Sequence, residues 1–160
     1  KSKVIVEGEL GYIRGSSELH KEAIEIQEND LTKPEQAMDF VEKTGVDLLA
    51  IAVGNVHGMN VGSSNPRLDI QRIKKIKEAV RIPLVLHGGS GTSDEDFLAA
   101  IEAGISIIHI NTELRLAWRQ GLEKALKDNP EEIVPYKILP FTVKAMKKIV
   151  EQKLRLFNKI

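Results

Sequence analysis

Two short segments place a histidine directly before glycine at the end of an apolar run: NVHG at residues 55–58 and PLVLHGGSG at residues 83–91. Imidazole is a common metal ligand, and glycines leave backbone N–H groups open to a close anion. A single strand-end histidine is more often a hydrogen-bonded structural residue, but two such segments in succession make a functional role about as expected as a structural one. The candidate metal ligands are His57 and His87, and the candidate anion-binding residues are Gly58, Gly88, Gly89 and Ser90.

Further polar groups occur where the other apolar runs end. In VEGELG, Glu7 and Glu9 lie two residues apart and share one face of a strand. Carboxylates in a strand buried on both faces are costly unless they are paired or bind a metal, which makes Glu9 a candidate metal ligand. In ISIIHINTE, His109 shares a face with Asn111. His109 could complete a three-histidine zinc site, contact substrate or only pack, and these alternatives stay open.

Four apolar runs predict the strands that position these residues. They cover residues 4–11, 47–58, 82–89 and 105–113. Because the runs are continuous rather than alternating, we expect strands buried on both faces, as in a parallel sheet. Four strand–helix units amount to half of a (β/α)8 barrel, in which functional residues lie at the carboxyl ends of the strands.

Helix signals separate and follow these runs. The expected helices cover residues 33–43, 69–80 and 94–103, a segment that opens at Asn111 or Thr112, and about 142–157. Thr32 is the expected cap of the first helix and Ser93 that of the third. We expect residues 12–31 to form a mobile loop, and an anion to bind near Thr112, where a helix begins.

Composition limits the class of protein. The 160 residues fit a single domain, residues 1–160, and the 23 basic and 23 acidic residues leave no excess for general nucleic-acid binding. The absence of cysteine excludes disulfides and thiolate sites. No apolar run approaches the roughly 18 residues of a membrane span, and no signal peptide is present, so we expect a cytoplasmic protein. Because the chain begins Lys1-Ser2-Lys3 without Met, we also expect a segment upstream.

The segments VEGELG, AIAVGNVHG, PLVLHGGSG and INTELRLAW, in this order, resemble the motifs of class II, metal-dependent fructose-1,6-bisphosphate aldolases and the related tagatose-bisphosphate aldolases. The resemblance covers nearly the whole chain. It corresponds to the C-terminal half of that family's TIM barrel, strands five to eight with their helices plus a C-terminal helix. It implies a homo-oligomeric, zinc-dependent enzyme of glycolysis and gluconeogenesis that cleaves a sugar bisphosphate. The alternatives are a tagatose-bisphosphate aldolase and a non-catalytic phosphate- or metal-binding half-barrel that needs an N-terminal half.

The resemblance also implies roles for single residues. His57 and His87 match two of the three histidines that hold the catalytic zinc, and Glu9 matches a carboxylate of a second site for a divalent or monovalent cation. The residues that match groups around the substrate and its phosphate are Gly58, Gly88, Gly89, Ser90, His109, Asn111 and Thr112.

The sequence departs from the family pattern at several positions, among them Asn60 and Val61, which replace a frequent Tyr-Lys. The Asp-His pair that gives the third zinc ligand and the catalytic aspartate lies on an earlier strand of the family and has no counterpart here. His109 stands where the family commonly has a substrate-binding asparagine. Glu18 matches the catalytic glutamate of the mobile loop if one residue is inserted, and without a gap the position is Ser17. We therefore expect the 160 residues alone to lack aldolase activity.

Overall fold

The computed structural model describes residues 4–160. Lys1, Ser2 and Lys3, on which the expectation of an upstream segment rests, lie outside the described residues. The chain divides into two compact units, the first ending at Ile110 and the second covering Asn111–Ile160. That residues 1–160 form one domain stays a prediction, and the two units are described separately.

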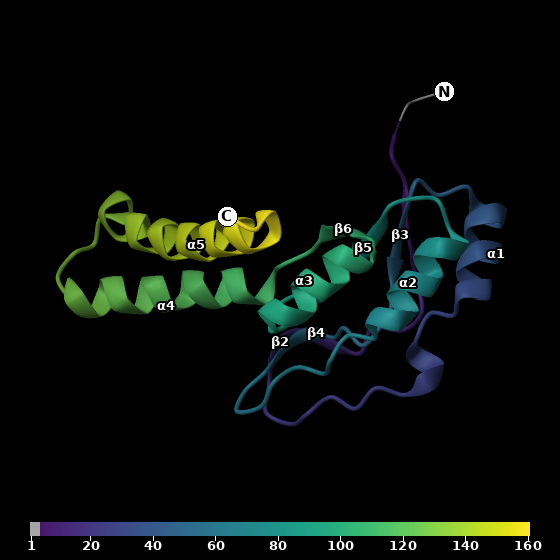
Figure 1. Cartoon of the computed structure of the whole chain (residues 1–160). Coiled ribbons are helices and arrows are strands. Elements are labelled where there is room, and N and C mark those ends of the chain that lie inside the picture. The colour runs from purple at the N-terminus through teal and green to yellow at the C-terminus, as the bar shows by residue number, and fades with distance from the viewer. Residues whose placement is uncertain (1–3) are drawn as a thin grey trace. The chain divides into compact units, whose positions relative to one another are not determined.

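The first unit is built on a four-stranded parallel sheet with the strand order β1-β3-β5-β6 (Figure 1). The strands are β1 (Glu7–Leu10), β3 (Leu48–Ile51), β5 (Leu84–Leu86) and β6 (Ile105–Ile108). Each strand lies within one of the four apolar runs, and each pairs in parallel with the next. The expected parallel α/β arrangement is confirmed, although the strands are shorter than the runs.

The register of this sheet assigns its side chains to two faces. Glu9 on β1 is the Cα partner of Ala50 on β3, which in turn is the partner of Val85 on β5. These residues share a face, and side chains along a strand alternate between faces. We call this face the inner face. By the same alternation it also carries Glu7, two residues before Glu9, and His87, two residues after Val85. His109 lies there too, two residues after the β6 partner of Val85.

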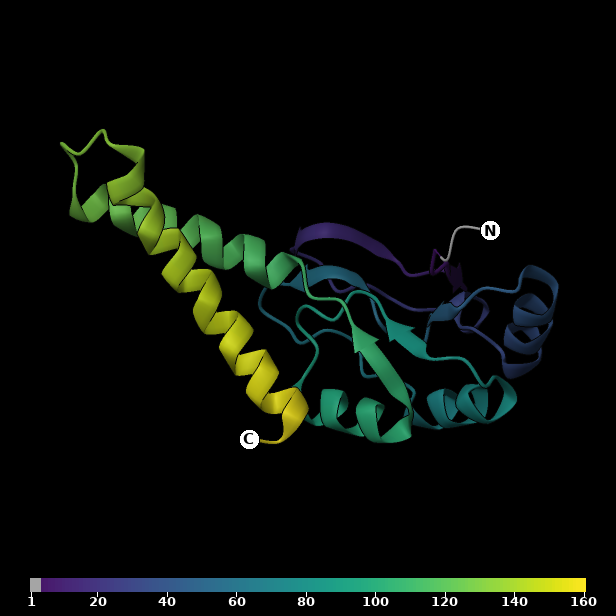
Figure 2. The same cartoon turned by 90° about the horizontal axis from the view of Figure 1, so that it is seen from above.

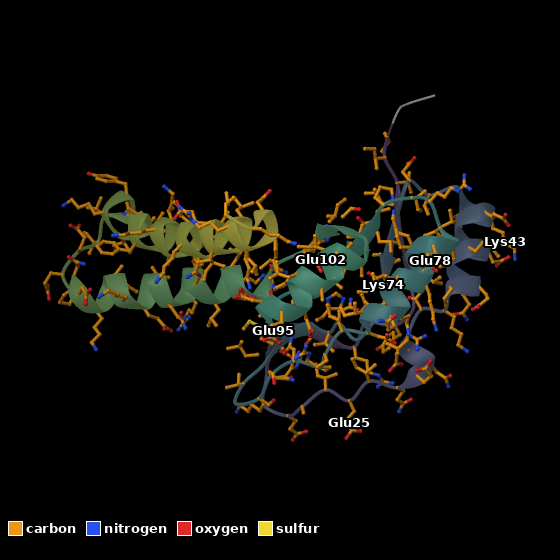
Figure 3. All side chains as sticks on the ribbon, viewed as in Figure 1. Glu25, Lys43, Lys74, Glu78, Glu95 and Glu102 are labelled. Carbon is orange, nitrogen blue, oxygen red and sulfur yellow. The ribbon has the colours of Figure 1, made fainter. Side chains whose placement is uncertain are left out.

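Three helices cover the other face of the sheet, where the core of the first unit lies. They are α1 (Pro34–Thr44), α2 (Ile70–Ala79) and α3 (Asp94–Ala103), and they lie side by side along the sheet (Figure 2). Strand and helix side chains without solvent exposure form this core: Leu49, Ile51, Leu84, Leu86, Ile73, Ile76 and Phe97. The charged side chains labelled on these helices in Figure 3 point to solvent instead: Lys43, Lys74, Glu78, Glu95 and Glu102.

One of the two expected caps is confirmed. The Ser93 hydroxyl accepts a hydrogen bond from a first-turn N–H of α3. Thr32 does not cap α1, whose N-cap is Lys33. The Thr32 hydroxyl instead donates to the Leu10 carbonyl at 2.5 Å and accepts from the Ala52 N–H at 2.9 Å. The prediction for Thr32 is wrong because this buried hydroxyl joins the ends of β1 and β3.

Residues 12–31, expected to form a loop, contain regular structure. They include β2 (Gly15–His20) and a 3-10 helix at Glu28–Asp30. β2 pairs in parallel with β4 (His57–Asn60) in a second, two-stranded sheet. The run at 47–58, expected to be one strand, is therefore split into β3 and the start of β4. His57 begins β4 and does not end β3.

The second unit is a helical hairpin of α4 (Thr112–Asp128) and α5 (Pro135–Asn158) (Figure 1). α5 starts earlier than the expected Thr142 and continues through Pro140. A Cβ at Gly121 of α4 would lie 3.0 Å from the Cα of Thr142, so glycine allows the helices to approach closely there. None of the helices in residues 4–160 combines the length and apolar character that a membrane crossing requires.

Candidate functional site

A histidine between two carboxylates forms the centre of the candidate site. His87, directly after β5, is hydrogen-bonded through Nδ1 to Glu9 Oε2 at 2.6 Å and through Nε2 to Glu7 Oε1 at 2.8 Å. The His87 side chain is 19% exposed. A neutral imidazole has a single N–H, so both nitrogens donate at once only when the ring is protonated. The two carboxylates therefore create a position suited to a cation, whether an imidazolium or a metal ion.

The sheet explains how these side chains meet. β3 lies between β1 and β5, and neighbouring strands are about 4.8 Å apart. Glu9 and His87 must therefore reach toward each other over β3, across the position of Ala50. Ala50 has no solvent exposure and only a methyl group on this face. The small residue leaves the space in which the carboxylate and the imidazole meet.

His109, one residue beyond β6, completes the cluster. Its ring stacks on that of His87 with centroids 4.6 Å apart and an interplanar angle of 18°. Each of Glu7, His87 and His109 offers one ligand atom, and these three atoms all lie within 4.8 Å of one another. In residues 4–160 this is the sole group of three or more His, Asp or Glu side chains that meets this criterion. Imidazole nitrogen and carboxylate oxygen are ligands that zinc takes in proteins, so the donor set fits such an ion.

Main-chain bonds hold both histidines in place. The buried Asn55 side chain donates through Nδ2 to the His87 carbonyl at 3.0 Å and accepts from the Val53 N–H at 2.8 Å. The His109 N–H donates to the Leu86 carbonyl at 2.9 Å, which continues the pairing of β6 with β5. The two rings are therefore carried by backbone that is fixed to neighbouring elements.

His57, the other expected histidine ligand, is not a member of this cluster. Its N–H donates to the Arg14 carbonyl at 2.8 Å, and its carbonyl is 2.9 Å from Nε2 of His20 on β2. The neighbouring peptide of Val56 is in contact with Gly88, where any Cβ would collide with the Val56 carbonyl. The backbone of His57 thus lies close to the loop that follows His87. A role for its side chain in metal binding stays a prediction.

The glycine-rich loop after His87 is tightly packed. Gly88 has a φ of +62°. Gly89 donates its N–H to the His109 carbonyl at 3.1 Å, and a Cβ there would lie 2.9 Å from Ile110. Ser90 is buried. Anion binding by this loop stays a prediction, and the Gly89 N–H would have to leave His109 to take part in it.

Glu18 lies exposed on β2, and its carboxylate accepts a hydrogen bond from the Ser16 hydroxyl at 2.5 Å. Gly58, with a φ of +89°, follows His57 and packs against this segment, since a Cβ there would collide with the Glu18 carbonyl. β2 therefore holds the expected catalytic glutamate beside the His57–Gly58 peptide. The role of Glu18 in catalysis is not tested by this contact.

An ion pair anchors the chain between β1 and β2. Arg14 is bonded to the Asp30 carboxylate at 2.5 and 3.0 Å. This contact, together with a hydrogen bond from the Gln27 N–H, lowers the pKa of Asp30 below its ordinary range. Asp30 also accepts a bond from the Tyr12 N–H through its carbonyl. The segment that leads to Glu18 is therefore attached at a defined point.

Asn111 and Thr112 belong to the second unit, at the start of α4. Asn111 is the N-cap residue, and its carbonyl accepts the Arg115 N–H at 3.0 Å. Thr112 is buried. The helix start was expected at one of these two residues, and that prediction is confirmed. Their roles toward substrate and anion stay predictions.

Glu7 is the member of the cluster that the sequence did not single out. The signal was present, since Glu7 and Glu9 share one face of the same strand. Both carboxylates bind His87, one through each ring nitrogen. Two acidic residues on one face of a strand should therefore have drawn attention to both residues and not to Glu9 alone.

Comparison with known structures shows the fold to be that of aldolase barrels. The chain is 36% identical to the YdjI aldolase from Escherichia coli K12, with a TM-score of 0.69 over 96% of this chain and 48% of that chain. It is 30% identical to a putative fructose-1,6-bisphosphate aldolase from Coccidioides immitis, with a TM-score of 0.77 over 97% and 52% of the two chains. The fructose-bisphosphate aldolase of Campylobacter jejuni, at 24% identity and a TM-score of 0.72 over 98% and 52%, shares the fold.

The chain thus spans about half the length of these solved aldolases, as a partial barrel of parallel strands and helices would. The family model for class II fructose-bisphosphate aldolases matches residues 1–160. Because that match extends over every residue of the sequence, the chain belongs to the class II fructose-bisphosphate aldolase family.

Proposed function

We propose that this chain supplies the C-terminal half of a zinc-dependent aldolase site that cleaves fructose 1,6-bisphosphate reversibly. The products are dihydroxyacetone phosphate and glyceraldehyde 3-phosphate. The observation that carries the proposal is the meeting of two carboxylates and two imidazoles on the inner face of the sheet. In barrels of this kind, functional groups gather where the strands end.

Zinc is the proposed metal, and His87 is its proposed central ligand. The mutual proximity of donor atoms from Glu7, His87 and His109 supports this assignment. His57 is proposed as a second histidine ligand, and Glu9 as a ligand of a further cation, both on the family resemblance. When bound, the zinc ion would supply Lewis-acid polarisation of the substrate ketone. Glu7 or Glu9 must release its hydrogen bond before the His87 nitrogen that it occupies can bind a metal.

The glycine loops are proposed to hold one phosphate of the substrate and thereby to orient the carbon that reacts. The proposed contacts are the residues that the resemblance identifies: Gly58, Gly88, Gly89, Ser90, Asn111 and Thr112. The positive φ values at Gly58 and Gly88 support close backbone approach there. His109 is proposed to contact the substrate or the metal.

Glu18 is the proposed base that removes the α-proton of dihydroxyacetone phosphate in the condensation direction of the aldol reaction. The carboxylate of such a base must come within hydrogen-bond distance of the carbon whose proton it accepts. Its present partner is the Ser16 hydroxyl, so that bond must open before the carboxylate is free to act. The contact between β2 and the His57–Gly58 peptide supports a position near the substrate.

The substrate could also be tagatose 1,6-bisphosphate, which differs from the fructose compound at one stereocentre. A reaction of either kind would belong to sugar-phosphate metabolism. The proposed setting is glycolysis and gluconeogenesis in the cytoplasm, and the proposed assembly is a homo-oligomer.

A non-catalytic role as a phosphate- or metal-binding half-barrel is the second candidate. It is supported by the match to about half of each solved aldolase.

The direct test is a coupled assay for triose phosphate release from both ketose bisphosphates, with zinc added. We expect no cleavage by the 160-residue chain alone, and cleavage after addition of the N-terminal half of a class II aldolase barrel. That activity should be lost with a chelator and in His87→Ala. Cleavage that survives the chelator would contradict the proposal. Robust, chelator-sensitive cleavage by the chain alone would instead make His109 the third zinc ligand.

A further inference from the structure

Asn65 joins two segments that the proposed function places around phosphate. It lies in the loop between β4 and α2 and is half-buried. Its Nδ2 donates to the Ser90 carbonyl at 2.9 Å and, more weakly, to the Gly58 carbonyl at 3.4 Å. Its Oδ1 accepts the Asn60 N–H at 2.9 Å. One side-chain amide therefore connects the HGGSG loop, residues 87–91, with Gly58 and Asn60 of β4.

The HGGSG loop is closed against this amide. Gly91 has a φ of +80°, and a Cβ there would lie 2.8 Å from Nδ2 and 3.0 Å from Cγ of Asn65. The loop can therefore come this close to Asn65 only because residue 91 is glycine. The contact between Gly91 and Asn65, together with the hydrogen bonds of Asn65, fixes the distance between the HGGSG loop and the segment that carries Asn65.

The bond to Ser90 also sets the direction of a peptide group. In a trans peptide the C=O and the following N–H point to opposite sides. With the Ser90 carbonyl held toward Asn65, the N–H of Gly91 must point away from Asn65. An anion site built from backbone N–H groups depends on the direction of each group, because hydrogen bonds weaken steeply away from linearity.

We infer that Asn65 is a positioning residue for phosphate: it orients the Ser90–Gly91 peptide and holds the HGGSG loop against Gly58, so that the loop can bind a phosphate dianion. This inference rests on the proposed function, which assigns phosphate to these loops. Asn65 does not contact the phosphate itself. It has no hydrogen bond to Glu7, Glu9 or His87 among those of the described residues, so its effect should be on phosphate and not on metal.

Two substitutions distinguish the hydrogen bonds of the Asn65 amide from the space that its side chain fills. Asn65→Leu retains nearly the same size and shape but removes every side-chain hydrogen bond. Asn65→Ala removes the hydrogen bonds and the side-chain volume. Asn29→Ala is the matched control, since Asn29 is an exposed asparagine in the 3-10 helix. Inorganic phosphate is the probe, titrated into the isotope-labelled 160-residue chain while the amide NMR signals of Gly88, Ser90 and Gly91 are followed. Zinc affinity and thermal unfolding are measured on the same samples.

We expect saturable phosphate-dependent shifts in the unsubstituted chain and in Asn29→Ala. Both Asn65 variants should bind phosphate roughly three- to tenfold more weakly, the loss expected for one hydrogen bond, with zinc affinity unchanged.

The inference would be overturned if the folded Asn65→Leu variant bound phosphate within twofold of the unsubstituted chain. A fall in its melting temperature would not alter that conclusion, because the amide would then only stabilise the loop. No phosphate-dependent shift in the unsubstituted chain would remove the proposed phosphate site, and the role of Asn65 with it. An equal loss of zinc and phosphate affinity would show general disruption and would also overturn the inference.

Discussion

Ala50 determines whether the carboxylates of β1 can reach His87. A larger side chain on the inner face of β3 would occupy the space between Glu9 and His87, so Ala50→Leu should separate them. We expect zinc affinity to fall at least tenfold, as when groups that orient a metal ligand are removed, alongside about 1–3 kcal/mol of overpacking cost. Competition with a chromophoric chelator measures the affinity.

The matched control for this experiment is Ala37→Leu. Ala37 is also fully buried, but it lies on α1 and away from the cluster. It should lose stability without losing zinc affinity. Equal zinc affinity in the two variants would show that zinc binding does not depend on the contact between Glu9 and His87 over Ala50 of β3.

Asp30 should make stability depend on pH in acid. Its pKa is lowered in the folded chain, chiefly by the hydrogen bond from Arg14, below the ordinary value of about 3.9. A lowered folded pKa contributes stability above the unfolded pKa, and this contribution is lost as pH falls through the folded value. Urea unfolding between about pH 5 and pH 2 should therefore show a shallower loss of stability in Asp30→Asn than in the unsubstituted chain.

Asp39→Asn provides the comparison for that measurement, because it removes an exposed aspartate of α1. A slope in Asp30→Asn identical to that of the unsubstituted chain would contradict the role given to the Arg14 pair. Arg14→Gln should flatten the slope in the same direction, since it removes the main cause of the lowered pKa of Asp30.

The sequence predicts the position of a side chain in the candidate site where the strand pattern alone places it. His87 and His109 each follow the end of a strand of the sheet, and the period of two along β1 places Glu9 on their face. His57 was harder, because its position depends on the chain between β3 and β4, which leaves the main sheet. The pairing of both His87 nitrogens with carboxylates required three strands in register and could not be deduced from any single segment.

At the level of secondary-structure elements, the apolar runs identified all four strands of the main sheet. β2 was missed because its sequence, GSSELH, is polar and almost entirely exposed, so no hydrophobic period marks it. The start of α5 was placed too late because an internal proline such as Pro140 usually interrupts a helix. Burial and pairing partners, which decide these cases, are properties of the folded chain.

Thr32 was assigned to a helix cap because Pro34 falls in the expected first turn and Glu35 follows the cap by three residues. Its hydroxyl in fact satisfies the Leu10 carbonyl and the Ala52 N–H without any solvent exposure. Thr32→Val should remove both of these hydrogen bonds and leave only the longer bond from the Ala52 N–H to the Leu10 carbonyl at 3.3 Å. The loss of two hydrogen bonds should cost about 1–3 kcal/mol in the free energy of unfolding. Thr32→Ser should lose less, because it retains the hydroxyl.

Thr44→Val is the control for that pair of variants. Thr44 lies exposed in the last turn of α1, where its hydroxyl bonds only to the Phe40 carbonyl. A change within roughly 0.5 kcal/mol is expected there, as for other surface substitutions. If Thr32→Val lost no more stability than Thr44→Val, the hydroxyl would not be what joins β1 to β3.

For the whole molecule, the sheet and the comparisons describe a partial barrel. In residues 4–160, β1 and β6 each have one strand neighbour in the main sheet, so each leaves one edge without a partner. Such edges favour pairing with another chain or segment. A homo-oligomer and a site completed by further barrel strands both stay predictions.

We propose that His87, between its carboxylates and beside His109, holds the metal of this aldolase-family chain. Anomalous diffraction at the zinc absorption edge, from crystals of the chain grown with zinc, tests it most directly. We predict a peak about 2.0–2.1 Å from a ring nitrogen of His87, with a carboxylate or a second imidazole completing the ligands. A map without zinc at His87, in which both ring nitrogens remain bonded to Glu7 and Glu9, would rule out this role for His87. Zinc bound only elsewhere on the chain would rule it out as well.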